Sequence, residues 1–447
     1  MSRRGDMAAS IEVGQWLNQR PLGRFQLRLL VLCGLCMILD GFDVQAMGYV
    51  APALLEDWGV AKAALGPVFS AGLFGLLLGA LLFGALADRI GRRPVLLACT
   101  LLFGIGMLAT AAAQTLPQLM LLRLLTGIGL GGIMPNAMAL AGEYSPAARR
   151  ASLMMLISCG FTAGALLGGL LAAWLIPAHG WRSVFLAGGV LPLLLWLPML
   201  RALPESAQFL LLRGRAAQAA RWLRKMAPEL PADARLWLDE KPSASSPVAA
   251  LFAQGLARRT LLLWLLSFLN LIVLYFLSNW MPSLLRAQGL TMRHALLAGS
   301  MLQLGGVLGT LSMGFWIDRD GYRRVLLAGF LAAALGLWLL GRTEGQALWL
   351  FILLFGTGFA IIGGQPAVNA LAASSYPTAL RATGVGWSLG VGRIGSVLGP
   401  GLGGVLIGLG WNQQALFGLL SLVALASAAA VWAYHRQGGK PQRQGAA

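Results

Sequence analysis

The chain has 447 residues, of which 57% are hydrophobic and only 11% are charged. Average soluble proteins carry about 25% charged residues, so this composition excludes a soluble enzyme, a disordered protein and a fibrous protein. The formal net charge of +18 would indicate nucleic-acid binding in a soluble protein. In a membrane protein, the distribution of that charge along the chain decides its meaning.

Apolar segments long enough to cross a bilayer recur from one end of the chain to the other. A span needs about 20 mostly apolar residues, because the hydrocarbon core is about 30 Å thick. Twelve segments meet this requirement, and we predict an all-α integral membrane protein with twelve transmembrane helices. In chain order the segments are Leu27–Val50, Leu65–Ala87, Val95–Ala113, Pro117–Leu140, Ser152–Ile176, Ser183–Leu200, Leu261–Trp280, Ala295–Ile317, Val325–Leu340, Ala347–Ala372, Ala382–Leu409 and Gln414–Tyr434.

The basic residues follow the positive-inside rule if the N-terminus lies in the cytoplasm. Most Lys and Arg residues then fall in cytoplasmic segments, ten of them between Arg201 and Arg259. The opposite face carries only Lys62, Arg182, Arg286, Arg293 and Arg342. The basic excess therefore predicts a multi-pass protein of the lipid bilayer with both termini in the cytoplasm, and it does not require nucleic acid as a partner.

Internal repetition is the strongest signal of domain organisation. The segment Gly84–Arg93 after the second predicted helix reappears as Gly314–Arg324 after the eighth, 230 residues later. The fourth and tenth helices share a second pattern at an offset of 231, in which Gly127, Pro135, Pro146 and Arg150 match Gly358, Pro366, Pro377 and Arg381. Two parallel six-helix halves follow from these offsets, and such halves place a substrate site between them near the bilayer midplane.

The repeat also sets the expected domain boundaries. We expect a cytoplasmic N-terminal tail over 1–26, a six-helix half over 27–200, a cytoplasmic linker over 201–259, a second half over 260–435 and a cytoplasmic tail over 436–447. The Pro and Ser residues of Pro242–Pro247 predict a flexible connection within the linker.

Several motifs resemble those of the major facilitator superfamily. Gly84–Arg93 resembles its signature loop between helices 2 and 3, Arg123–Gly129 its helix-4 motif, and Pro204–Leu210 its P-E-S-x-x-F-L motif. More narrowly, Asp40–Asp43 reads D-G-x-D, as in the aromatic acid:proton symporter family. Known members import benzoate-type and phenylpropionate-type carboxylates. The resemblance implies a small aromatic carboxylate as substrate and a bacterial inner membrane as location.

Charged residues inside predicted helices are expected to be functional, because each one costs a few kcal/mol at membrane depth. Asp40 and Asp43 lie about one turn apart on the first helix. Arg123 on the fourth helix lies at a depth of about 9 Å, close to the roughly 10 Å of Asp43. We interpret the three as a proton-coupling group, in which one of the two aspartates binds the proton and Arg123 modulates it. A static salt bridge between the two helices is the alternative.

Arg393 on the eleventh helix has no acidic residue within any helix of its own half. A substrate carboxylate would neutralise it in bidentate fashion, although carbonyl groups or a gating role are alternatives. Other candidates for the substrate pocket are Tyr275, Asn279, Trp280, Gln303, Gln365 and Asn369. An aromatic at helical spacing more often packs helices together, and a buried amide often bridges them.

A third group lies at the cytoplasmic edge of the predicted helices, and in the family its loop is associated with conformational cycling. Opposite charges there are expected to form a latch when the cytoplasmic side is shut, while positive-inside topology explains the arginines alone. The candidate latch residues are Gly84, Asp88, Arg89, Gly91, Arg92, Arg93, Glu143, Arg150 and Asp318. Asp320 and Tyr322 depart from the pattern in the second half, where we expect a weaker latch.

The sequence thus predicts a proton-coupled transporter that imports an aromatic carboxylate by alternating access. It contains no P-loop, zinc motif or G-x-S-x-G, and we expect no enzymatic activity, no metal, no cofactor other than the coupled proton and no obligate protein partner. Cys33 and Cys36 form a C-x-x-C within an apolar segment and are expected to be packing residues. The alternatives are a proton-coupled antiporter that exports drugs or organic anions, and a transporter-like membrane receptor.

Overall fold

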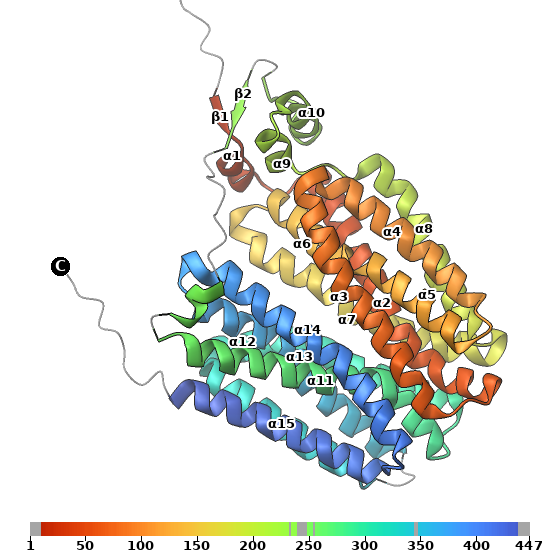
Figure 1. Ribbon diagram of the computed structural model, residues 1–447. Coiled ribbons are helices and arrows are strands. Elements are labelled where there is room, and N and C mark those ends of the chain that lie inside the picture. Colours follow the sequence, from red (N-terminus) through yellow and green to blue (C-terminus); the bar gives the residue numbers. More distant parts are fainter. Residues whose placement is uncertain (1–9, 232–233, 239–247, 254, 344–346, 437–447) are drawn as a thin grey trace, which may run out of the picture.

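The computed structural model describes residues 10–231, 234–238, 248–253, 255–343 and 347–436, and Figure 1 shows two groups of long helices lying side by side. The predicted flexible stretch Pro242–Pro247, most of the N-terminal tail and all but Arg436 of the C-terminal tail lie outside the described residues. The helices of the first group are α2 (Arg24–Trp58), α3 (Leu65–Ile90), α4 (Arg92–Ala111), α5 (Leu116–Gly131), α6 (Ile133–Tyr144), α7 (Arg150–His179) and α8 (Arg182–Ala202). Those of the second are α11 (Ala257–Ala287), α12 (Met292–Leu340), α13 (Ala347–Ser375), α14 (Thr378–Gly408) and α15 (Gln413–Arg436).

The number of membrane crossings agrees with the sequence analysis. Within the described residues, ten helices are long and apolar enough to cross a membrane, with α5 and α6 counted as one span over Leu116–Tyr144. The 49-residue helix α12 bends at Gly321 and contains two successive spans. The 35-residue helix α2, which packs against α7 and α11, completes the set. The prediction of twelve transmembrane helices in a major facilitator fold is confirmed.

The internal repeat is visible in the backbone at the two short connections that carry the repeated motif. Gly91, between α3 and α4, has φ of 106° and ψ of 159°, and Gly321, within α12, has φ of 78° and ψ of 159°. Residues other than glycine rarely adopt a positive φ. The two positions are 230 residues apart, so the two halves turn the chain with the same backbone conformation at matching places.

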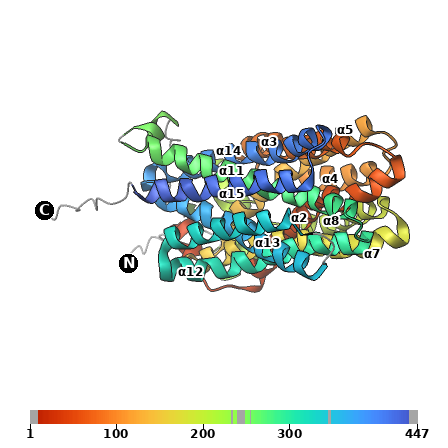
Figure 2. The ribbon, with the colours of Figure 1, turned by 90° about the horizontal axis from the view of Figure 1, so that it is seen from below.

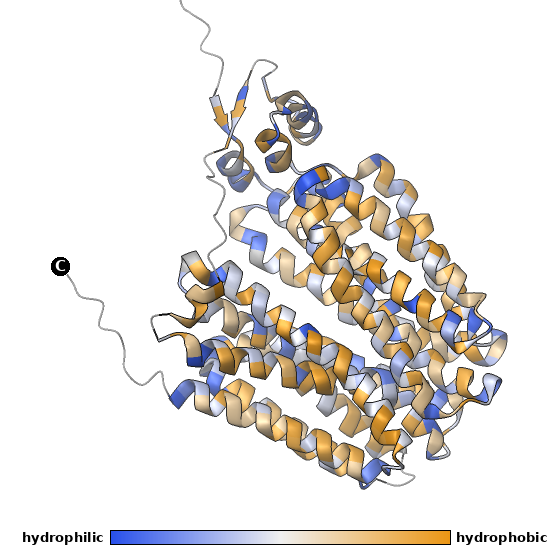
Figure 3. Cartoon of the chain, in the orientation of Figure 1, coloured by the Kyte–Doolittle hydropathy of each residue, from blue (hydrophilic) through white to orange (hydrophobic). Residues whose placement is uncertain are grey.

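The outer surface of the bundle is apolar. Figure 3 shows mostly hydrophobic residues along the helices and hydrophilic residues gathered toward the helix ends. Large apolar side chains such as Leu81, Trp174 and Phe315 are exposed on this surface. An apolar surface of this extent is unfavourable in water, whereas it suits contact with lipid chains.

Short elements cover one end of the bundle, which we call the linker end. Strands β1 (Ser10–Glu12) and β2 (Arg235–Trp237) pair in parallel beside helices α1 (Val13–Gln19), α9 (Ala207–Leu212) and α10 (Ala216–Met226) (Figure 1). Arg20 forms an ion pair with Glu229 and lowers the pKa of that carboxyl. The N-terminal segment and the region predicted as a linker therefore fold together.

Three helix pairs join the two halves. Helix α2 packs on α11, α3 on α14 and α7 on α12, and the last two pairs lie at opposite edges of the bundle in Figure 2. Toward the end opposite the linker, the Ser70 hydroxyl donates to the Val397 carbonyl at 2.8 Å, and Arg286 pairs with Glu56 at 2.7 Å. Within the described residues, no hydrogen bond or ion pair joins the halves at the linker end. The halves are therefore closed at the opposite end.

Candidate functional site

Helix α2 carries two buried carboxylates about one turn apart, and one of them is fully paired. Asp43 is 0% exposed, and its two oxygens accept hydrogen bonds from the guanidinium of Arg123 on α5, at 2.9 Å from Nη1 and 2.7 Å from Nη2. Such bidentate, charge-assisted pairs are among the strongest hydrogen bonds in proteins. The structure therefore brings together the helix-1 and helix-4 charges that the sequence analysis singled out.

The surroundings of Arg123 hold its guanidinium in place. Its Nη1 lies 3.2 Å from the Met107 sulfur, and its Cζ lies 5.6 Å from the centre of the Phe185 ring. A cation over an aromatic face is favourable, especially where water is excluded. Helices α4 and α8 thus support a pair that α2 and α5 form, and a small cavity beside it is lined by Asp43, Arg123 and Asn279 among others.

Asp40 differs from Asp43 in its hydrogen bonding. Its side chain is 2% exposed, and its Oδ1 has no hydrogen-bond partner among the described residues. The charges of Arg393 and Asp43 act on it. A buried polar atom without a partner is costly, and a buried charge without a direct partner is costlier still. Asp40 is therefore the carboxylate of this group that is more easily held as a neutral acid.

Arg393 on α14 faces the N-terminal half. It is partly buried, and its Nη2 lies 3.7 Å from the sulfur of Met134 on α6. Its charge acts on both Asp40 and the hydroxyl of Tyr275 on α11. The interface between the halves thus holds an acid, a phenol and a cation within electrostatic reach of one another.

A chain of three amides lies in the C-terminal half. The Asn270 amide donates to Gln365 at 2.7 Å, and the Gln365 amide donates to Asn369 at 3.1 Å. The Oδ1 of Asn270 is buried without a partner among the described residues. The sequence analysis missed Asn270, although a lone amide in the apolar run Leu261–Leu277 was a usable signal.

Three pocket candidates have other contacts. Trp280 is fully buried, donates to the Pro400 carbonyl at 2.9 Å and meets Phe69 edge-on at 5.0 Å, so it packs α11 against α14 and α3. The Asn279 amide donates to the Tyr275 carbonyl of its own helix at 2.8 Å. Gln303 donates to Gln45 of the other half. The structure does not join these three to the amide chain.

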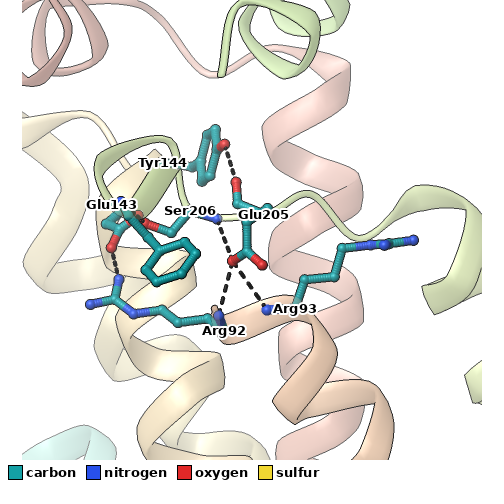
Figure 4. A network of polar contacts seen from close by, with 7 residues as sticks. Arg92, Arg93, Glu143, Tyr144, Glu205 and Ser206 are labelled. Carbon is teal, nitrogen blue, oxygen red and sulfur yellow. Dashed lines mark hydrogen bonds and ion pairs between the residues drawn. The ribbon is translucent and has the colours of Figure 1, made fainter. Parts of the chain in front are cut away.

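The charges at the linker end form a network within the N-terminal half (Figure 4). Arg92 at the start of α4 forms an ion pair with Glu143 near the end of α6. One carboxylate oxygen of Glu205 accepts from the backbone N–H groups of Arg92 at 2.9 Å, Arg93 at 3.2 Å and Ser206 at 2.8 Å. A carboxylate at a helix N-terminus satisfies otherwise unpaired N–H groups and complements the helix dipole.

Glu205 was quoted in a motif by the sequence analysis but was not identified as a site residue. Its backbone carbonyl accepts from the Tyr144 hydroxyl at 2.7 Å, and its carboxylate lies so close to Gly91 that a side chain there would collide with it. Arg93 donates to the carbonyls of Leu200 at 2.7 Å and Leu203 at 2.9 Å. Glu205 therefore ties the ends of α6 and α8 to the start of α4.

The remaining latch candidates are placed outside this network. Asp88, Arg89 and Asp318 are exposed, and a methyl group at Gly84 would meet no neighbour. Arg150 donates to Asn18 of α1 at 2.5 Å and to the Ser145 carbonyl, rather than pairing with Glu143. The contacts of Arg150 thus anchor the N-terminal segment.

Comparison with known proteins assigns the family. The model of the Major Facilitator Superfamily matches residues 33–313 and again residues 263–447, and the chain belongs to that superfamily of transporters, not to an enzyme family. It is 42% identical to the 4-hydroxybenzoate transporter PcaK of Pseudomonas aeruginosa over 94% of this chain and 95% of that protein. It is 43% identical to the gallate transporter of Pseudomonas putida over 95% of each chain. Among solved structures it resembles the xylose transporter XylE of E. coli in a partially occluded inward-open conformation, with a TM-score of 0.72 and 16% identity over 95% of this chain and 100% of that one.

Removing one member of the buried pair is expected to destabilise the protein more than removing both. Arg123→Gln leaves the Asp43 carboxylate buried without a cation, which costs about 3–5 kcal/mol. The double variant Asp43→Asn/Arg123→Gln leaves two neutral amides, and its thermal unfolding temperature in detergent should recover part of the loss. Glu56→Gln, at an exposed ion pair, is the control and should cost less than about 1 kcal/mol. A double variant no more stable than Arg123→Gln would contradict this.

Gly91→Ala tests the cap that Glu205 provides. The substitution adds backbone strain of about 1–3 kcal/mol at a positive φ and also pushes the Glu205 carboxylate away from α4. Gly321→Ala carries the same strain at the matching position, where a methyl group meets nothing. We expect a larger fall in unfolding temperature for Gly91→Ala, and equal falls would show that Glu205 contributes nothing.

Proposed function

We propose that this chain is a proton-coupled secondary transporter that imports a small aromatic carboxylate by alternating access. The observation that carries the mechanism is the contrast on α2, where Asp43 is paired with Arg123 and the Oδ1 of Asp40 has no partner. The substrate class is supported by two relatives of similar length, which are named as transporters of 4-hydroxybenzoate and gallate.

In this proposal Asp40 carries the coupled proton. Protonating Asp43 would weaken two charge-assisted bonds to Arg123, whereas protonating Asp40 breaks no direct ion pair. The ionised form of Asp40 is favoured by the charge of Arg393 and disfavoured by burial. Asp40 is thus balanced between two states, which a coupling group requires.

Arg393 connects the substrate to the proton. A carboxylate bound to its guanidinium in bidentate fashion would neutralise the cation that favours ionised Asp40. Binding of the anion and binding of the proton then favour each other, and by linkage the effect is reciprocal. The pair crosses the membrane as one anion and one proton, without net charge, and no cofactor takes part.

The rest of the substrate meets the C-terminal half. Tyr275, close enough to Arg393 to feel its charge, offers an aromatic wall, and the amide chain of Asn270, Gln365 and Asn369 offers donors and an acceptor for ring hydroxyls. An apolar site with a few placed polar groups is the usual form of a small-molecule pocket. The unpartnered Oδ1 of Asn270 gives a phenolic hydroxyl a specific acceptor.

The described contacts correspond to one state of the cycle. The halves meet at the end opposite the linker, through Ser70 with Val397 and Glu56 with Arg286. The basic residues gather at the linker end, which by the positive-inside rule is cytoplasmic. We assign the conformation as inward-facing, in the inner membrane of a bacterium, with both termini in the cytoplasm.

Uptake in cells tests the function directly. Cells that express the chain should accumulate labelled 4-hydroxybenzoate, and a protonophore should abolish the accumulation. Asp40→Asn should abolish accumulation while exchange of external for internal substrate continues, because a permanently neutral residue permits the loaded step. Asp320→Asn, at an exposed acid, is the matched control. Accumulation that survives both the protonophore and Asp40→Asn would contradict proton coupling, and efflux of preloaded substrate would indicate an exporter.

Asn270→Leu tests the assignment of the ring hydroxyl. The variant should bind 4-hydroxybenzoate about tenfold more weakly, because one buried hydrogen bond is lost, while its affinity for unsubstituted benzoate should change little. Competition by each compound against labelled substrate measures both affinities. Equal weakening for the two compounds would mean that Asn270 does not contact the hydroxyl.

A further inference from the structure

Helix α11 contains a carbonyl that cannot be satisfied by the usual helical donor. Proline has no backbone N–H, so Pro282 cannot donate to the carbonyl of Ser278, four residues earlier. The donor comes from the other half of the protein, because the Gln45 side-chain amide of α2 donates to this carbonyl. Gln45 and Ser278 are 4% and 3% exposed, so water has little access to the bond.

A second amide completes the arrangement. The Nε2 of Gln303 on α12 lies 3.2 Å from the Oε1 of Gln45 and 3.4 Å from the hydroxyl of Ser278. The acceptor oxygen of Gln45 is therefore used as well as its donor. Gln45 is fixed at both ends of its amide by the C-terminal half, although it belongs to the N-terminal half.

The backbones of α2 and α11 touch next to this bond. A methyl group at Gly48 would lie 2.5 Å from the Ser278 carbonyl oxygen and 3.0 Å from the Cα of Asn279, so only glycine permits the approach. Pro52 of α2 stands 230 residues before Pro282 and is its counterpart in the repeat. The two proline-containing helices therefore cross where Gln45 reaches the free carbonyl.

We propose that Gln45 is a positioning residue of the transport cycle, which holds the end opposite the linker closed by donating to the carbonyl that Pro282 leaves free. The proposal rests on the alternating access described above. Any motion that separates α2 from α11 at this end breaks the bond and leaves a backbone carbonyl to be satisfied by water. The bond thus stabilises the inward-facing state relative to the outward-facing one.

The position of Gln45 also couples this closure to the proton site. It lies two residues after Asp43 and five after Asp40 on the same helix. A shift of α2 on protonation therefore acts on the Gln45 bond directly, through the backbone of one helix.

The test measures how often the closed end opens. A Ser70→Cys reporter lies between α3 and α14, where Ser70 contacts Val397, and all four native cysteines are buried. In the purified protein, without substrate, Gln45→Met should raise the rate of maleimide labelling of the reporter about fivefold, the factor expected for one buried hydrogen bond. Gln26→Met is the matched control, because Gln26 is equally buried and donates to the Tyr144 carbonyl within its own half. It should leave the rate unchanged.

Pro282→Ala provides the second variant and an internal check. An alanine N–H can satisfy the Ser278 carbonyl within α11, so the Gln45 bond loses its purpose and labelling should rise by a similar factor. Adding Gln45→Met to Pro282→Ala should then produce no further rise. A mere packing defect would instead make the two factors multiply.

Multiplied factors, or a Gln45→Met rate equal to that of Gln26→Met, would overturn the proposal. Each single variant tests it alone if the other does not fold. Because no substrate is added, the result is independent of whether the chain carries aromatic acids. The uptake measurement decides that question separately.

Discussion

The structure depends on one constraint, which is that a charge inside the hydrocarbon layer must be matched by another group of the protein. Asp43 and Arg123 satisfy this constraint for each other with two hydrogen bonds, and they tie α2 to α5. Asp40 and Arg393 satisfy it only through longer-range interaction across the two halves. The first pair therefore forms a fixed reference, and the second forms a balance that a proton or a substrate anion can shift. Helix α2 belongs to both.

The same helix connects the chemistry to the motion. Over six residues, from Asp40 to Gln45, α2 presents an incompletely paired acid, a paired acid and an amide bonded to the other half. A rigid helix transmits a shift at one of these positions to the others. Proton binding, substrate binding and closure of one end therefore act on a single element, and the network of Glu205 and Arg92 stiffens the far ends of the helices around it.

The sequence predicted the parts that depend on composition and spacing. Span lengths, the repeat and the approach of Asp43 to Arg123 follow from hydropathy, from the offsets of 230 and 231, and from matching depths along two helices. Contacts that depend on helix rotation and crossing could not be predicted. Gln45 reaches Ser278 only because α2 and α11 touch at Gly48, and Trp280 turned out to pack against Pro400. Asn270 and Glu205 were readable as polar residues, but their partners lie about 95 and 113 residues away in the chain.

Proton uptake on substrate binding tests the central claim most directly. Purified protein in weakly buffered detergent solution near neutral pH is mixed with 4-hydroxybenzoate, and a pH-sensitive dye records protons taken up while calorimetry records binding. The account expects uptake approaching about one proton per bound anion in the unsubstituted protein, and binding without uptake in Asp40→Asn, because anion and proton binding are linked through Arg393 and Asp40. Undiminished proton uptake in Asp40→Asn would contradict it and would assign the proton to another group.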